Sequence, residues 1–195
     1  MAGHVVFVCV ANRVRSPFAE FLFTDAIAKS GENITVSSAG YVPQVLKDKL
    51  TGYNISIPEP FFNRPMSELT RAALLEKDVT VPNGWRSKEL SPEILREADL
   101  IFTAISMQKE ALSSRYTEFR NKIFNISDLS EKNDYPFLED FSIIPLDENF
   151  WHYCEEDPEY VSKTLKTWEE ILISAFPKII KELSLGSEEK DKALT

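Results

Sequence analysis

Near the N-terminus lies the stretch that decides the fold, VVFVCVANRVRSP, residues 5–17. Residues 4–8 are mostly apolar and β-branched, which predicts a short buried strand. Ser16 followed by Pro17 predicts the N-cap and the first residue of a helix. A short loop from the carboxyl end of a strand to the amino end of a helix is a place where backbone N–H groups converge on an anion. The stretch therefore predicts an anion-binding loop directly after the first strand.

Two reactive side chains flank this loop, Cys9 and Arg15. A helix N-terminus and a guanidinium both favour the thiolate form of a nearby cysteine, and the thiolate is the nucleophile. An arginine holds two oxygens of a phosphate in a bidentate fork. These parts predict a phosphate-ester hydrolase that works through a cysteinyl-phosphate. The structural alternative is a buried cysteine beside a solvated arginine.

The composition is that of an ordinary soluble globular protein with an acidic balance. The chain has 195 residues, enough for one domain with a sizeable core and no disulfides. It carries 22 Lys and Arg against 31 Asp and Glu, a formal net charge of −9. This charge argues against nucleic acid or an anionic membrane as a general partner. An anion site in such a chain needs a local focus of positive charge.

Cysteine usage and hydropathy exclude other classes. Cys9 and Cys154 are the only cysteines, and neither a disulfide framework nor a zinc motif is present in the sequence. We expect no metal and no cofactor. The N-terminus lacks a basic leader region, and no apolar run approaches 18 residues. The expected location is the cytoplasm, where thiols stay reduced.

Strand patterns alternate with helix patterns along the chain. Helical spacing or capping residues predict helices at 16–30, 67–76, 91–98, 106–116 and 158 to about 185, with Gly31 ending the first helix. Further apolar runs predict strands at 34–39, 98–104 and 122–126. Such alternation predicts an α/β fold of three layers, a doubly wound parallel four-stranded sheet with helices on both faces. The loop after strand 1 then lies at the carboxyl edge of the sheet, where ligands bind in such folds.

Three regions lack a sustained period. Residues 41–62 contain several prolines and aromatics and are interpreted as an insertion or ordered loop, a common place for a lid or binding surface. Residues 127–156 form a second irregular region, rich in acidic residues. Residues 186–195 are polar and predict a frayed C-terminal tail. Residues 1–185 are interpreted as one domain.

The stretch Cys9 to Pro17 resembles the signature of low-molecular-weight protein tyrosine phosphatases, Cys-x5-Arg-Ser-Pro at the extreme N-terminus. Ser38-Ala39-Gly40, residues 86–90 and residues 98–104 are similar to further segments of that family. The resemblance implies that Ser38 holds the loop rigid and that Cys9 is the nucleophile, with Arg15 as its partner. It also implies a set of substrate-binding residues: Val10, Ala11, Asn12, Arg13, Val14, Ser16 and Tyr160.

The resemblance also implies a general acid, Asp157, because an Asp-Pro pair before the last helix supplies it in the family. Asp157-Pro158 is the only such pair in the chain. One carboxyl group can protonate the leaving oxygen and then activate water. The alternative is that Asp157 only caps the helix, since a helix N-terminus favours a carboxylate.

The chain departs from the family pattern within the loop. Ala11 replaces a glycine, Arg13 a small or apolar residue, and Val14 a cysteine found in many members. Three functions remain open at this point. The first is a phosphomonoester hydrolase, similar to a protein tyrosine phosphatase, that acts on a phosphorylated protein or a small phosphomonoester and releases inorganic phosphate. The second is an arsenate reductase-like oxyanion enzyme, for which only Cys154 could supply a second thiol. The third is a non-catalytic module that binds phosphorylated residues.

Overall fold

A four-stranded parallel sheet forms the centre of the computed structural model, which describes residues 3–129, 144 and 146–192. Its strands are β1 (Gly3–Cys9), β2 (Ile34–Gly40), β3 (Leu100–Thr103) and β4 (Ile123–Asn125), in the order β2-β1-β3-β4. Every neighbouring pair is parallel. The predicted α/β architecture is therefore confirmed, and β1 lies between two strands.

Alternation along β1 divides the core into two halves. Val5, Phe7 and Cys9 belong to one buried apolar cluster, whereas Val6 and Val8 belong to the other. Successive side chains of a strand point to opposite faces, so a strand covered on both faces needs an unbroken apolar run. That is why residues 5–8 are all apolar and fully buried.

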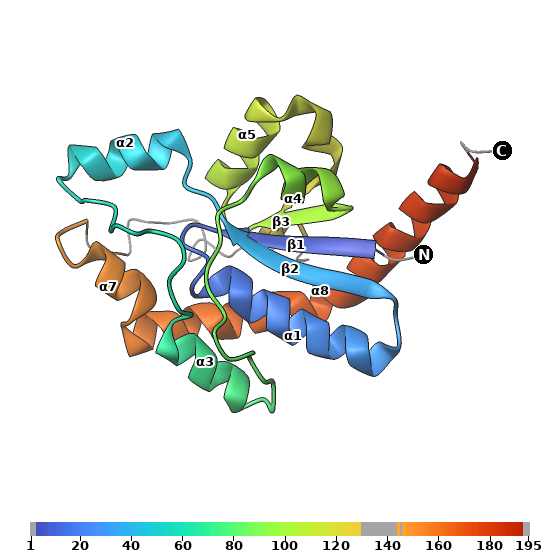
Figure 1. Ribbon diagram of the computed structural model, residues 1–195, viewed down its shortest axis with the longest axis horizontal. Helices are drawn as coiled ribbons and strands as arrows, with labels where there is room; N and C mark the ends of the chain where they lie inside the picture. Colours follow the sequence, from blue (N-terminus) through green and yellow to red (C-terminus); the bar gives the residue numbers. More distant parts are fainter. Residues whose placement is uncertain (1–2, 130–143, 145, 193–195) are drawn as a thin grey trace.

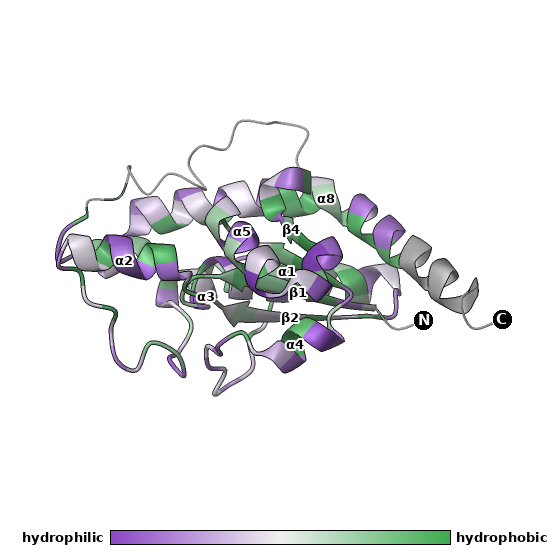
Figure 2. Cartoon of the chain, turned by 90° about the horizontal axis from the view of Figure 1, so that it is seen from above, coloured by the Kyte–Doolittle hydropathy of each residue, from purple (hydrophilic) through white to green (hydrophobic). Residues whose placement is uncertain are grey.

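Helices cover both faces of the sheet (Figure 1). The face under Val5 and Phe7 packs against α1 (Arg15–Ser30) and α8 (Pro158–Lys192), and the opposite face packs against α4 (Pro92–Glu97) and α5 (Ser106–Arg115). Both purple and green segments occur along the helices in Figure 2, as expected for helices with one buried side. The remaining elements are α2 (Gln44–Gly52), α3 (Glu68–Leu75), α7 (Phe150–Glu155) and the 3-10 helices η1 (Thr117–Lys122) and η2 (Ile126–Leu129).

The start of α1 differs from the prediction. The helix begins at Arg15, its N-cap position is Val14, and no side chain caps it. Ser16 already lies within the first turn, where its hydroxyl contacts Cys9 instead of the helix backbone. Pro17 remains in the first turn, where a missing N–H costs no intrahelical hydrogen bond. The predicted stop is confirmed, since Gly31 adopts a φ of 75° and its N–H donates to Ile27.

The regions without a period contain more helix than predicted. Residues 41–62 include α2, and residues 127–156 include η2 and α7, although 130–143 and 145 lie outside the described residues. The last helix extends to Lys192 and passes through Pro177, so most of the predicted tail from 186 onward is helical. The described residues form no helix with the length and hydropathy that a membrane span requires.

Candidate active site

A pocket lies at the carboxyl end of β1. The predicted site residues that line it are Cys9, Val10, Ala11, Arg13, Val14 and Arg15. Its other walls come from α2 and α7 and consist of Leu46, Phe150, Trp151, Cys154 and Glu155. The structure thus brings the N-terminal loop together with two segments that had no recognisable motif.

Cys9 is held at the base of this pocket. It is the last residue of β1, only 2 % of its surface is exposed, and it pairs with Gly40 of β2. The Ser16 hydroxyl donates a hydrogen bond to its Sγ over 3.0 Å. A hydroxyl donor stabilises a thiolate, because the charged sulfur accepts the bond more strongly than a thiol does.

Asn12 braces the loop from behind the pocket. Its backbone is left-handed, with a φ of 54°, a conformation that Asn tolerates better than most residues. Its fully buried amide donates to the Ser16 hydroxyl over 3.0 Å and to the Ser38 hydroxyl over 2.7 Å, and its carbonyl accepts from the Lys88 N–H over 2.9 Å. The expected contact between Ser38 and the loop is therefore confirmed. Ala11 has no positive φ, so the loop accommodates its Cβ without left-handed strain.

The loop also presents backbone donors that other described residues leave unused. None of the N–H groups from Ala11 to Ser16 donates a hydrogen bond to another described residue. Ala11, Asn12, Arg13, Val14 and Ser16 are all buried, where an unpaired N–H is costly. Successive free donors beside a helix N-terminus form an anion-binding cradle.

Arg15 is the uncommitted cation of the site. Within the described part of the chain its guanidinium makes no hydrogen bond or ion pair, and it is half-buried on the pocket wall. It lies close enough to Cys154 and Tyr160 to influence both of them electrostatically. Its five N–H donors therefore remain available to an oxyanion at Cys9.

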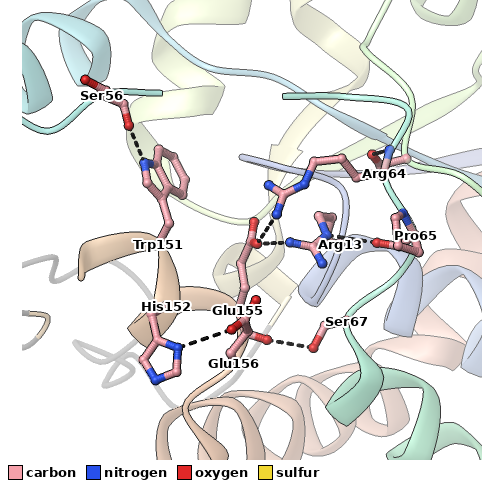
Figure 3. A network of polar contacts seen from close by, with 10 residues as sticks. Arg13, Ser56, Arg64, Pro65, Ser67, Trp151, His152, Glu155 and Glu156 are labelled. Carbon is pink, nitrogen blue, oxygen red and sulfur yellow. Dashed lines mark hydrogen bonds and ion pairs between the residues drawn. The ribbon is translucent and has the colours of Figure 1, made fainter. Parts of the chain in front are cut away.

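The Arg13 side chain, in contrast, is already occupied. Its Nε donates to the Pro65 carbonyl over 2.8 Å, and its Nη1 pairs with Oε2 of Glu155 (Figure 3). Burial lowers the pKa of Arg13 to about 10, and nearby Arg64 acts in the same direction. The guanidinium remains charged at neutral pH. The structure therefore gives Arg13 protein partners where the sequence predicted a substrate-binding side chain.

Asp157 sits at the N-terminus of α8. Its Oδ1 accepts the N–H of Tyr160 over 2.8 Å, and its carbonyl accepts the N–H of Val161, so it is the N-cap. Its Oδ2 has no hydrogen-bond partner within the described residues. Neither Asp157 nor Tyr160 lines the pocket. Burial raises the pKa of the Tyr160 hydroxyl, which Arg15 partly opposes.

The 41–62 segment packs against α7 beside the loop. Trp151 of α7 donates from its indole nitrogen to the Ser56 carbonyl over 2.8 Å, and its ring meets Phe61 edge-on at 5.1 Å. Phe62 of the same segment lies against Gly40. A Cβ at this position would clash with the Phe62 ring and lie 2.9 Å from the Val10 carbonyl, so the position needs glycine. Sequence reasoning missed this wall because its apolar residues have no spacing that distinguishes them from core.

Cys154 and Glu155 are the other pocket residues that the sequence did not place there. Burial raises the pKa of the Cys154 thiol to about 12, so this thiol stays protonated at neutral pH. Glu155 is 3 % exposed, and its Oε2 receives Arg13 and, over 3.4 Å, Arg64. Arg13 and Arg15 on the pocket wall, with Arg64 close by, bring positive charge to this part of an acidic chain. Within the described residues no cluster of His, Cys, Asp or Glu has the arrangement of a metal site.

Comparison with known proteins agrees with this geometry. The model of the family "Low molecular weight phosphotyrosine protein phosphatase" matches residues 4–55. A protein-arginine-phosphatase of Bacillus subtilis is 27% identical over 124 residues, which are 64% of this chain and 70% of that protein. Among solved structures, a mutant of YwlE from Bacillus subtilis has a TM-score of 0.65 at 23% identity, covering 92% of this chain and 99% of that one. A low molecular weight protein tyrosine phosphatase from T. tengcongensis has a TM-score of 0.63 at 22% identity, covering 90% and 99%.

The parallel sheet and the cysteine-bearing loop define the class, an α/β protein with an oxyanion cradle between its first strand and first helix. The family model over residues 4–55 and the curated relative support a place for the chain in the low-molecular-weight phosphotyrosine protein phosphatase family.

Proposed function

We propose that this chain is a cysteine-dependent phosphatase that hydrolyses phosphomonoesters, with phosphorylated proteins as its substrate class. One observation carries the proposal. Cys9 and the uncommitted Arg15 line the same pocket, at a loop whose backbone N–H groups from Ala11 to Ser16 have no described protein acceptor. A phosphoryl group is the ligand that such a nucleophile, fork and cradle fit together.

The reaction has two steps. The Cys9 thiolate attacks phosphorus, the bond to the leaving oxygen breaks, and Asp157 gives that oxygen a proton. Water then attacks the cysteinyl-phosphate, Asp157 takes a proton from the water, and the thiolate leaves as inorganic phosphate forms. Through both steps Arg15 and the loop N–H groups hold the phosphoryl oxygens.

Capping and acid catalysis are compatible roles for Asp157. Oδ1 holds the N–H of Tyr160, whereas Oδ2 has no described partner and is available to carry the proton. Tyr160 remains a candidate for contacts with the leaving group, since Arg15 lies near it. Asn12 and Ser16 support Cys9 and the loop, and their contribution to substrate binding comes through the backbone.

The nature of the phosphorylated residue is a second question. The family model is described by phosphotyrosine, whereas the curated relative is a protein-arginine-phosphatase. Phosphoarginine is therefore a second candidate substrate, with a P–N bond in place of the P–O bond. Paired peptides that differ only in phosphotyrosine or phosphoarginine, compared by kcat/KM, decide between the two.

The other functions left open by the sequence gain less support. An arsenate reductase needs a second thiol that attacks readily, and the only other cysteine, Cys154, has a pKa raised to about 12. A pure binding module would not need a free nucleophile beside a free arginine. The deciding experiment is release of phosphate from phenyl phosphate by the wild-type chain and by Cys9→Ser. Turnover by the wild type alone supports the proposal, and an inactive wild type that still binds vanadate would favour the binding module.

A further inference from the structure

An ionic cluster, two of whose members line the pocket, joins three distant segments (Figure 3). It consists of Arg13 in the loop, Arg64 after the 41–62 segment, and Glu155 at the end of α7. Both arginines reach the same carboxylate oxygen, Oε2 of Glu155. Arg13 and Glu155 are separated by 142 positions in the sequence, and both are more than nine-tenths buried.

Stability alone is a poor explanation for this cluster. Burying charges costs free energy, and apolar side chains of similar size often hold a core equally well. The cluster is also incompletely satisfied, because Oε1 of Glu155 and Nη1 of Arg64 are buried without a hydrogen-bond partner among the described residues. An ion pair between arginine and a carboxylate instead fixes the direction and the distance between the groups that it joins.

Further contacts show which parts the cluster holds together. The Arg13 carbonyl accepts the Ser67 N–H over 3.0 Å, and the Ser67 hydroxyl donates to the Glu155 carbonyl over 2.6 Å. Glu155 is therefore tied to the loop both through its side chain and through Ser67. Two residues later comes Asp157, which caps α8.

We propose that Arg13 and Glu155 are a positioning pair, which sets the place of the α7–α8 corner, residues 155–158, relative to the loop that carries Cys9. The inference rests on the proposed function. Neither side chain touches the transferred proton. Instead, their ion pair fixes the distance from which Asp157 reaches the leaving group. Acid catalysis depends on such a distance, since a shift of about 1 Å in a reacting group can cost about 10²-fold in rate.

The test compares leaving groups in Glu155→Gln. Gln keeps the size of the side chain but lacks the charge that both arginines pair with. We expect kcat/KM, which reports the first step, to fall about 10–10²-fold on phenyl phosphate, a share of the typical contribution of about 10²–10⁴-fold from a general acid. On nitrophenyl phosphate, whose leaving group needs little protonation, kcat/KM should stay within about threefold by the same reasoning. Inhibition by vanadate, which reports Cys9, Arg15 and the loop, should remain unchanged.

Non-additivity is the sharper readout. If Glu155 acts through Asp157, the double variant Glu155→Gln/Asp157→Asn should be no slower on phenyl phosphate than Asp157→Asn alone. Equal losses on both esters, or losses that multiply in the double variant, would overturn the inference and leave Glu155 with a structural role. Activity of the wild type on nitrophenyl phosphate, absent in Cys9→Ser, tests the proposed function separately.

Matched variants complete the experiment. Glu169→Gln is the matched control. It breaks the 2.7 Å ion pair between Lys77, just after α3, and Glu169 of α8, and Glu169 lies outside the pocket. It should leave kinetics on both esters unchanged.

Arg13→Lys serves if Glu155→Gln does not fold, because lysine keeps the charge but has no Nε that could donate to Pro65 while its terminal nitrogen pairs with Glu155. It should show the same preference for the better leaving group, and wild-type ratios in a folded Arg13→Lys variant would refute the pair.

Discussion

Two regions carry the groups of the proposed reaction, and they are built differently. The nucleophile end, residues 9–16, is one continuous turn between a central strand and a helix, braced by neutral hydrogen bonds from Asn12 and Ser16. The acid end, the α7–α8 corner, follows a six-residue helix and is tied to the loop by ions and by Ser67. At the first end the partners of the reactive groups are local or lie on β2. At the second, Asp157 caps its own helix, and it is Glu155 whose partners Arg13, Arg64 and Ser67 lie more than 80 positions away.

This difference teaches where precision comes from in each region. Cys9 inherits its place from β1, since a strand paired on both sides leaves its last residue little freedom. Asp157 has no strand behind it, and one of its oxygens is engaged in capping. The nucleophile end should therefore tolerate few chemical changes and fail for every substrate. Changes at the acid end should slow hydrolysis most for substrates whose leaving group needs a proton.

The largest expected effect is at the nucleophile itself. Cys9→Ser should lower phosphate release from aryl phosphates to background, because a serine hydroxyl in this site is a far weaker nucleophile than a thiolate. Oxyanion binding should persist, since Arg15 and the loop N–H groups remain. The measurements are steady-state kinetics and calorimetric titration with vanadate. Turnover close to wild type would remove Cys9 from the mechanism.

Next in size is the loss of the arginine fork. Arg15→Lys keeps the positive charge but cannot donate two parallel hydrogen bonds to the phosphoryl oxygens. We expect kcat to fall about 10²–10³-fold, the usual cost of one lost oxyanion donor. The loss should be the same for phenyl and nitrophenyl phosphate, in contrast to variants of the acid end. A near-normal kcat would mean that charge alone suffices here.

At the acid end the loss should depend on the substrate. Asp157→Asn should slow hydrolysis of phenyl phosphate by about 10²-fold, at the lower end of general acid contributions, and that of nitrophenyl phosphate much less. Asn caps a helix nearly as well as Asp, so thermal stability should hardly change. If turnover also stays at the wild-type level, Asp157 is a cap and nothing more.

A smaller effect separates the two cysteines of the pocket. The thiolate is the form that iodoacetamide alkylates, and a pKa raised to about 12 leaves Cys154 protonated at pH 8. Native protein should therefore take up one label, at Cys9, and phosphate should protect it. Mass spectrometry of the labelled peptides checks this. The second label should appear only after denaturation, and early labelling of Cys154 would contradict its raised pKa.

No effect at all is expected from removing divalent metals. Arg15 and the loop donors already neutralise the phosphoryl oxygens, and no metal-type cluster exists in the described residues. Aryl phosphatase activity should be equal when it is measured with and without a chelator. Activity that is lost with the chelator and restored by a divalent ion would contradict a metal-independent reaction.

Much of the nucleophile end could be predicted because its information is local. Buried β1 and Gly31 at the end of α1 follow from short-range patterns, and the contact between Ser38 and the loop was implied by the family resemblance. The N-cap was predicted wrongly, because Ser16 satisfies Cys9 instead of the helix backbone. A serine hydroxyl that can reach both the cysteine sulfur and the helix backbone carries no sequence signature that shows which of the two it will bond.

The sequence by itself determined the α/β order, the family resemblance and the placing of Cys9 and Arg15 in one loop, because all of these rest on neighbours along the chain. Only the tertiary structure decided that α2 and α7 wall the pocket and that Arg13 faces Glu155. It also decided that Cys154 shares the pocket with Cys9. The physical reason is that side-chain contacts between remote segments depend on how the chain returns to the sheet edge. That return is set by packing of the whole core and leaves no periodic pattern in any one segment.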